Sequence, residues 1–311
     1  MIHEQHSFRL THDLYAAEIL MAGATLSRLT HAGRDLIAPA DAPHAPAFAG
    51  ALLAPWPNRV VDGRYLFAGE VHELPITEQG RHHAIHGLAH ALTFTLAEPH
   101  TVDTLTLTAT LEPTAGYPWR LQLTARFELT DEGLRYGLTA ENLSRDPAPY
   151  GAATHPYLVA GPGPCDEWRL ELAVSERLEV APNRLIPQRL APHEGFDGPI
   201  GEARHDHAFT GVVWEGGDAS EAFARARVWA PEGTGVEIAW DHHCPWVQVF
   251  TCDLGENSPA NRSALAVEPM TCAPDAFNSG VYPFDTGLVT LEPSAQHDVR
   301  WRISVLAAPT A

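Results

Sequence analysis

The chain of 311 residues contains no lysine, so its 20 basic residues are all arginines. Several kinds of catalysis depend on a lysine amine, among them Schiff-base chemistry, attachment of pyridoxal phosphate and the phosphate-binding loop of nucleotide hydrolases. The missing lysine therefore excludes these classes of enzyme.

Cysteine is also scarce. The four cysteines include no CxxC pair; they are Cys165, Cys244, Cys252 and Cys272. A disulfide scaffold shows a denser set of cysteines in a shorter chain. We therefore expect free thiols, most of them buried.

The sequence has no apolar run long enough to span a membrane, and it does not begin with a basic and then apolar leader. Its formal net charge is −19, without any cluster of arginines, which disfavours nucleic acid and anionic lipid as partners. We expect a cytoplasmic protein that binds a small neutral molecule. An acidic balance also serves solubility alone.

Alternation of apolar and polar residues dominates the chain. Residues 119–129 alternate at period two, Asp131-Glu132-Gly133 supplies a turn, and residues 134–140 alternate again, which predicts a hairpin. The same signal marks residues 64–67 with 70–74, 104–111, 169–174, 223–229 with 236–240, and 299–306. Only residues 274–278 suggest a helical turn. We predict an all-β fold, a large antiparallel sandwich forming one domain over residues 1–311.

The 18 histidines offer candidate metal sites at His82-His83, His205 with His207, and His242-His243. Adjacent residues on a strand point to opposite faces, so neighbouring histidines chelate poorly. No third ligand lies at a suitable spacing. We expect no bound metal and interpret these residues as surface or loop histidines.

Four segments set polar residues among prolines and turns: residues 55–59, 84–87, 154–158 and 266–269. Glu268 follows the apolar residues 264–267 and precedes a proline, which predicts that it ends a buried strand. A carboxylate there is either paired, or functional with a raised pKa. His155 similarly ends a stretch with little charge. From the residues alone, a structural role for each is as good an interpretation as a catalytic one.

Taken in order, these segments and several others resemble the aldose 1-epimerase (galactose mutarotase) family, from about Phe8 to the last strand. The motifs that carry the resemblance are Pro57-Asn58-Arg59, Asp62-Gly63-Arg64-Tyr65, Ile85-His86-Gly87, Gly116-Tyr117-Pro118-Trp119, Asn142, His155-Pro156-Tyr157, Asp206-His207-Ala208-Phe209, Glu268, Pro274-Asp275-Ala276 and Asn278.

The resemblance implies a β-supersandwich of the galactose mutarotase type and an isomerase of carbohydrate metabolism that needs no cofactor. Its substrate would be a monosaccharide, a hexose such as glucose or galactose. The resemblance also implies that Glu268 is the catalytic base and His155 the catalytic acid. Arg59, His86 and Asp206 match the residues that bind the sugar.

Several positions depart from the family pattern. His83 stands where many members carry Asn, Leu88 replaces a second Gly, and Met270 replaces a common Gln. These departures concern sugar binding more than proton transfer. The reaction is therefore more strongly implied than the sugar.

These residue types suit a change of anomer. Ring opening moves one proton off the C1 hydroxyl and one onto the ring oxygen, and a carboxylate with an imidazolium across the ring supplies both transfers. Trp56, Tyr157 and Trp246 lie near the motifs and are candidate platforms for the sugar, with core packing as the simpler interpretation.

Three alternatives remain open at this stage. A hexose-6-phosphate 1-epimerase would need cations such as Arg59 and Arg81 for the phosphate. A non-catalytic sugar-binding protein would keep the groove without the chemistry. A glycoside hydrolase would need two carboxylates, for which Glu268 and Asp206 are the pair.

Overall fold

The computed structural model describes residues 7–216 and 222–306. Within these ranges the regular structure is almost wholly strand, numbered β1 to β27, with three short 3₁₀ helices. The helices are η1 (Ala89–Ala91), η2 (Cys165–Glu167) and η3 (Ala276–Val281). The predicted all-β fold is confirmed.

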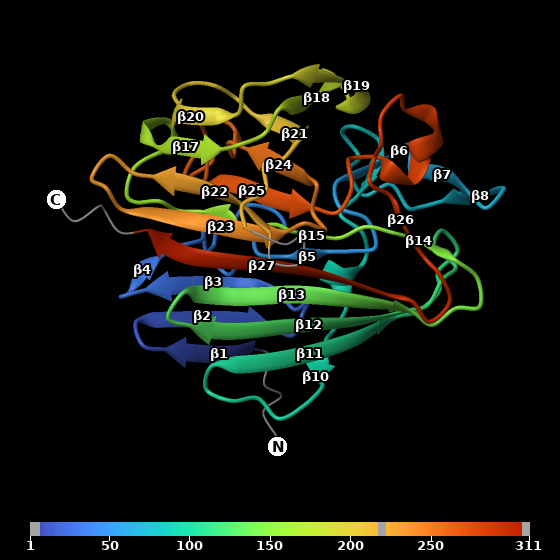
Figure 1. Cartoon of the computed structure of the whole chain (residues 1–311), viewed down its shortest axis with the longest axis horizontal. Helices are drawn as coiled ribbons and strands as arrows, with labels where there is room; N and C mark the ends of the chain where they lie inside the picture. The colour runs from blue at the N-terminus through green and yellow to red at the C-terminus, as the bar shows by residue number, and fades with distance from the viewer. Residues whose placement is uncertain (1–6, 217–221, 307–311) are drawn as a thin grey trace.

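The largest sheet has nine strands and runs across the face seen in Figure 1. Each of its ladders is antiparallel. In spatial order the strands are β10 (Thr95–Leu96), β11 (Thr104–Leu111), β12 (Leu121–Thr130), β13 (Gly133–Asn142), β27 (Gln296–Leu306), β23 (Gly235–Asp241), β22 (Phe223–Trp229), β17 (Arg169–Leu172) and β20 (Phe196–Pro199).

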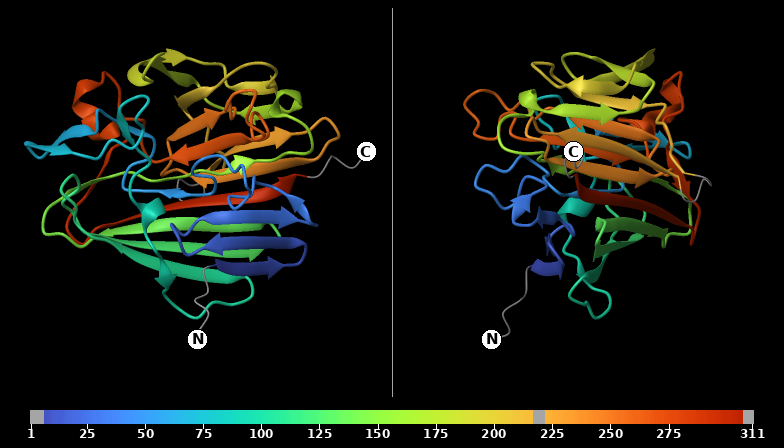
Figure 2. Two further views of the ribbon diagram at one scale, coloured as in Figure 1. Left: turned by 180° about the vertical axis from the view of Figure 1, so that it is seen from behind. Right: turned by 60° about the vertical axis from the view of Figure 1, so that its left-hand side comes forward.

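Two further sheets lie behind the first, as the turned views in Figure 2 show. One is four-stranded and backs the end that holds β11 to β13: β1 (Ser7–His12), β2 (Tyr15–Leu20), β3 (Leu26–His31) and β4 (Arg34–Asp35). The other is eight-stranded, with the order β19 (Ile186–Pro192), β18 (Glu176–Ala181), β21 (Asp206–Thr210), β24 (Trp246–Phe250), β25 (Leu265–Met270), β15 (Ala153–Thr154) and β5 (Leu52–Leu53), while β16 (Tyr157–Leu158) also pairs with β25.

Three two-stranded ladders complete the described structure. They are β6 (Arg59–Val61) with β9 (His83–Ile85), β7 (Arg64–Phe67) with β8 (Glu70–Glu73), and β14 (Ala148–Tyr150) with β26 (Val289–Leu291). The β7–β8 hairpin projects from one end of the molecule in Figure 1.

Most predicted strands are present where the alternation placed them. β11 and β22 have the predicted bounds, and the hairpins at Asp131-Glu132 and Ala68-Gly69 are formed. Two details differ. The helical turn begins at Ala276 rather than Pro274. Glu268 lies inside β25 rather than at its end, because Met270 still pairs with both β24 and β15 beyond the proline.

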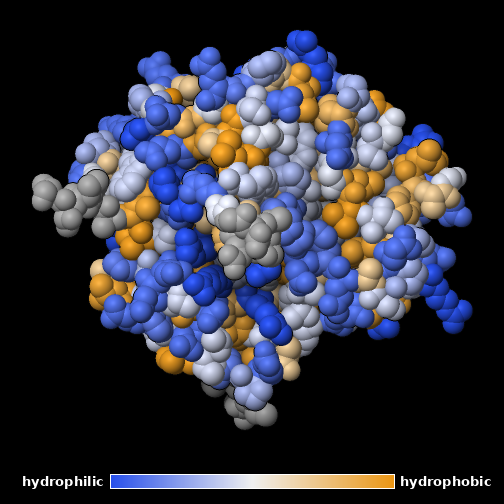
Figure 3. Space-filling model, viewed as in Figure 1, coloured by the Kyte–Doolittle hydropathy of each residue, from blue (hydrophilic) through white to orange (hydrophobic). Residues whose placement is uncertain are grey.

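The core fills the space between the sheets. Burial alternates along β11 and β12, and the core includes the buried tryptophans Trp168, Trp240 and Trp301. All four cysteines are free and buried, as expected. The face drawn in Figure 3 is mainly hydrophilic, with hydrophobic residues scattered over it. No helix in the described ranges is long and apolar enough to cross a membrane.

Replacement of Leu123 by alanine tests the inward face of β12. Leu123 is fully buried, and its loss leaves a cavity that lowers the free energy of unfolding by about 2–5 kcal/mol. The next residue, Thr124, points outward, so Thr124→Ala changes stability by less than about 1 kcal/mol. Urea unfolding of both variants measures the difference, and equal losses would contradict the assignment of the faces.

Candidate active site

Strand register brings His155 opposite Glu268. β25 pairs with β15 through Ala153 and Met270, and with β16 through Tyr157 and Ala266. His155 lies midway between these two pairs and Glu268 lies midway on the facing strand. The two side chains, 113 residues apart in the chain, therefore meet across one ladder.

The pair is in direct contact and almost fully buried. Nε2 of His155 lies 3.4 Å from Oε1 of Glu268, and the side chains are 6% and 3% exposed. The remaining polar atoms, Nδ1 of His155 and Oε2 of Glu268, are buried without a hydrogen-bond partner among the described residues. Buried polar groups are almost always satisfied in proteins, so a touching acid and base that each keep an unpaired atom are candidates for a functional site.

Burial moves both groups toward their uncharged forms. It lowers the pKa of His155 to about 4. It raises the pKa of Glu268 well above its usual value; the charge of Asp206 adds to this effect and that of Arg59 opposes it. Both shifts favour the same arrangement, a neutral imidazole beside a protonated carboxyl group, in which the pair holds one proton.

The β6–β9 ladder brings Arg59 and His86 to the same place. Arg59 pairs with Ile85, and the backbone N–H of His86 donates to the carbonyl of Asn58. Asn58 and His86 both have left-handed backbones, with φ of 53° and 64°, an uncommon conformation outside glycine. Gly87 follows with φ of 68°, and a Cβ there would lie 2.2 Å from the carbonyl oxygen of Ala54. This turn aims the imidazole of His86 at that of His155, with ring centroids 5.2 Å apart.

Arg59 lies between two carboxylates. Its Nε and Nη2 donate to Glu78 at 2.8 and 3.0 Å, and Nη2 is 3.8 Å from Oδ2 of Asp206. Oδ1 of Asp206 accepts a 2.7 Å hydrogen bond from Gln248, which faces Glu268 across the β24–β25 ladder. Charged and amide groups thus surround the acid–base pair on one side.

All five residues expected from the sequence gather in this site. Glu268 contacts His155, His86 packs against His155, and Arg59 approaches Asp206. Sequence reasoning missed Gln248 and Glu78. Gln248 carried a usable signal, because an amide inside the apolar run 246–250 must be paired or functional. Glu78 carried none, since its pairing with Arg59 arises only in the fold.

The three candidate aromatic platforms are buried: Trp56, Tyr157 and Trp246 are each at most 3% exposed. The core-packing interpretation fits them, and the Tyr157 ring stacks on the imidazole of His155. A half-buried ring that the sequence reading missed, Phe48, lies 4.6 Å from that of His86.

The described residues include no group of three or more His, Cys, Asp or Glu side chains arranged to hold a metal ion. His82 and His83 lie on opposite sides of their segment, one exposed and the other fully buried. His83 instead hydrogen-bonds the backbone carbonyl of Arg184.

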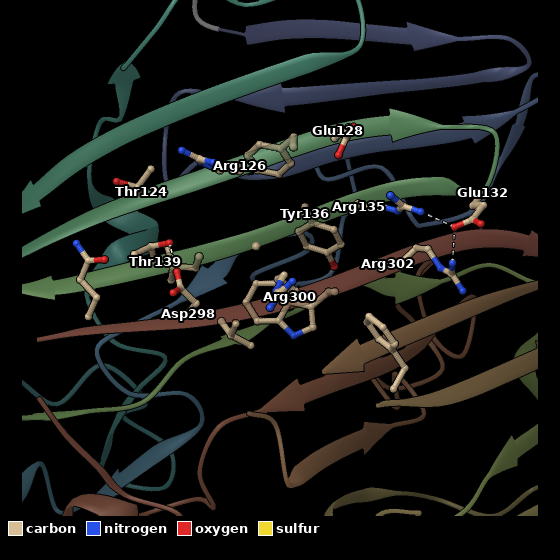
Figure 4. Close-up of a pocket in the computed structure, with 17 residues that line it drawn as sticks. Thr124, Arg126, Glu128, Glu132, Arg135, Tyr136, Thr139, Asp298, Arg300 and Arg302 are labelled. Atoms are coloured by element: carbon tan, nitrogen blue, oxygen red, sulfur yellow. Dashed lines mark hydrogen bonds and ion pairs between the residues drawn. The ribbon is translucent and has the colours of Figure 1, made fainter. Parts of the chain in front are cut away.

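A hollow lies elsewhere, on the outer face of β12, β13 and β27 (Figure 4). It has a volume of about 910 Å³, and its lining includes Arg126, Glu132, Arg135, Arg300 and Arg302. Glu132 already pairs with Arg135 and Arg302, as the dashed lines show. No histidine lines this hollow, so it offers no counterpart of the acid–base pair.

Residues 6–304 match the family described as Aldose 1-epimerase. The chain belongs to the aldose 1-epimerase family. An uncharacterized protein of Escherichia coli K12, YihR, is 32% identical over 297 residues, which cover 93% of this chain and 90% of that protein.

Solved structures show the same fold at low sequence identity. A galactose mutarotase-like protein from Clostridium acetobutylicum superposes with a TM-score of 0.80 at 16% identity, covering 99% of this chain and 97% of its own. The GalM/aldose epimerase homologue of C. elegans gives 0.80 at 18%, covering 97% and 99%. The antiparallel sheets of this aldose 1-epimerase family member are thus those of galactose mutarotase-like proteins.

The neutral state of His155 predicts a pH dependence of stability. With a pKa of about 4 when folded and about 6.5 when unfolded, the unfolded chain binds more protons between these values. The free energy of unfolding therefore falls as the pH drops through this window, by up to about 3 kcal/mol from this residue. Urea unfolding at pH 7.5 and pH 4.5 will show a smaller fall for His155→Gln than for the unmodified protein.

His44→Gln is the matched control, because His44 lies exposed on a loop. We expect its pH dependence to follow the unmodified protein. If the free energy of unfolding of His155→Gln fell between pH 7.5 and pH 4.5 by as much as that of the unmodified protein, this would contradict a buried neutral imidazole at His155.

Proposed function

We propose that this protein is an aldose 1-epimerase that interconverts the α and β anomers of a free aldose. The observation that carries the proposal is the buried contact between His155 and Glu268, each with an unpaired polar atom. Family membership supports the same reaction. Acid–base groups contribute typically about 10²–10⁴-fold each, which suits a reaction that already proceeds slowly in water.

The proton count of the pair fits the reaction. Opening the ring takes one proton from the C1 hydroxyl and delivers one to the ring oxygen, and closure on the other face reverses both transfers. A pair that holds a single proton offers one acid and one base at once. Doubly protonated or fully deprotonated, it lacks one of the two.

The sugar must approach the pair from one side. A gap of 3.4 Å between Nε2 of His155 and Oε1 of Glu268 does not admit a pyranose. This arrangement differs from the expected one, in which the two groups lie on opposite sides of the sugar ring. We infer that the incoming sugar draws the proton from Glu268 to His155 over this contact. Glu268 then acts as the base at C1 and His155 as the acid at the ring oxygen.

The neighbouring groups are suited to hold the sugar. Arg59 keeps N–H groups that no described residue accepts, and they can donate to hydroxyls or to the ring oxygen as negative charge develops. Burial lowers the pKa of His86 well below its usual value, and the positive charge of Arg59 adds to this effect, so its imidazole is neutral. Asp206 can accept a hydrogen bond from a sugar hydroxyl in addition to the one it accepts from Gln248.

The alternatives receive less support. Arg59 and Arg81 both donate to the carboxylate of Glu78, and Asp206 lies 3.8 Å from Arg59, so two carboxylates offset the two arginine charges and leave no excess positive charge for a phosphate. Asp206 is engaged by Gln248 and lies near Arg59, which suits binding better than service as the second carboxylate of a hydrolase. We therefore favour an uncharged monosaccharide, a hexose such as glucose or galactose.

We keep a single domain over residues 1–311 as part of this proposal. The nine-stranded sheet supports it, because β13 from the first half of the chain pairs with the last strand, β27.

Glu268→Gln tests the base. The amide keeps the size of the side chain but cannot take a proton, so we expect the enzymatic mutarotation rate to fall by at least about 10²-fold. Polarimetry of freshly dissolved α-aldoses measures the rate, and circular dichroism checks the fold. Near-normal rates in the folded variant would contradict the assignment. Glu112→Gln is the control: Glu112 is an exposed carboxylate that directly follows β11, so this variant should retain full activity.

A panel of substrates tests the sugar class. We expect acceleration with glucose or galactose and little with glucose 6-phosphate, because Glu78 and Asp206 offset the charges of Arg59 and Arg81. Faster conversion of the phosphorylated sugar would favour the hexose-6-phosphate alternative, and binding without acceleration would favour a non-catalytic sugar-binding protein.

A further inference from the structure

Glu78 and Arg59 form an ion pair with two hydrogen bonds beside the acid–base groups. Nε of Arg59 donates to Oε2 of Glu78 at 2.8 Å, and Nη2 donates to Oε1 at 3.0 Å. The side chain of Arg59 is 9% exposed and that of Glu78 is 17% exposed. Bidentate bonds of this kind fix the plane of a guanidinium as well as its position.

The pairing determines which Arg59 donors stay free. A guanidinium has five N–H groups. Two are taken by Glu78, and Nη1 donates one to Oδ1 of Asn58 at 3.3 Å. Of the remaining two, the one on Nη2 lies on the side of Asp206, whose Oδ2 is 3.8 Å away. A sugar can therefore meet two oriented donors.

The same pairing sets the charge that reaches Glu268. The positive charge of Arg59 favours the ionised form of Glu268, while burial and Asp206 oppose it. The carboxylate of Glu78 cancels part of that positive charge. Arg81, which donates to Oε1 of Glu78 at 2.8 Å, lies on the outer side and is 39% exposed, so solvent screens it more.

We propose that Glu78 is a positioning residue, which clamps Arg59 toward the substrate and limits how strongly its charge acts on Glu268. The proposal rests on the aldose 1-epimerase function above. It assigns a role to a residue that never touches the reacting atoms.

The charged and titratable groups around this arrangement are few. Those that face Glu268 or Arg59 from the neighbouring elements are His155, Asp206, Tyr157, His86, Glu78, Arg81 and His83. Among them Glu78 is the carboxylate hydrogen-bonded to Arg59, so its replacement changes the field at Glu268 without removing a group that transfers protons.

Two substitutions separate charge from position. Glu78→Gln keeps the shape but removes the negative charge, so the field at Glu268 becomes more positive and favours its ionised form. The alkaline limb of the pH profile of kcat/KM should move to lower pH by on the order of half a unit. Glu78→Asp keeps the charge but shortens the side chain, so it should raise KM while leaving the limb in place.

A second readout needs no substrate. In protein labelled with ¹⁵N-histidine, the imidazole signals of His155, assigned with the His155→Gln variant, follow loss of the last proton from the pair. Glu78→Gln should shift this titration to lower pH, as in the kinetic profile. Glu112→Gln is the surface control. Glu112 pairs with Arg120 in the exposed connection between β11 and β12, so this variant should leave both readouts unchanged.

The outcomes are distinguishable. If Glu78→Gln folds normally and leaves both the alkaline limb and the His155 titration unchanged, the proposal is overturned. If Glu78→Gln and Glu78→Asp shift the limb alike, position rather than charge matters and the charge-setting role is overturned. If the unmodified protein shows no mutarotation, the proposed function fails, and the His155 titration alone then decides whether Glu78 sets the charge of the site.

Discussion

The contact between His155 and Glu268 is the interaction on which the functional site depends. Two ionisable groups are placed together in the sheet interior, where water does not compensate a charge on either of them. When the pair holds a single proton it carries no net charge, and this lowers the free-energy cost of burying the two groups. Acid–base chemistry and fold stability are therefore linked through the same two side chains, and neither partner can be replaced without affecting the other.

The fold supplies the contact through strand register. β25 has neighbours on both sides, and the irregular passage from β15 to β16 places His155 beside it. The β6–β9 ladder then adds Arg59 and His86 from a different part of the chain. Left-handed backbone occurs there at Asn58, just before β6, and at His86 and Gly87, just after β9. Rigid strands thus set the proton-transfer pair, while a tight turn sets the binding groups.

The sequence allowed the strands and the site members to be predicted, but not their spacing. The alternation of apolar and polar residues predicted β11 and β22 with their bounds, because one face of each strand is buried and the other is more exposed to solvent. The resemblance to aldose 1-epimerases pointed to His155 and Glu268. It could not reveal their direct contact, since separation in space follows from register, and register is a property of the folded sheet.

Residues without a local pattern escaped prediction. Glu78 lies in a loop and resembles any solvated carboxylate in the sequence, yet it pairs with a nearly buried arginine. Gln248 could have been recognised as a polar residue inside an apolar strand. Charge compensation between distant segments is therefore the feature of this site that sequence patterns disclose least.

A double-mutant cycle on mutarotation tests the central claim most directly. His155→Gln and Glu268→Gln are measured singly and together on the best substrate, with the uncatalysed rate subtracted. If the two side chains act as one proton-sharing unit, the double variant is no slower than the slower single variant. If the fold-reduction in rate of the double variant equalled the product of the two single reductions, the side chains would act independently, which would contradict the account.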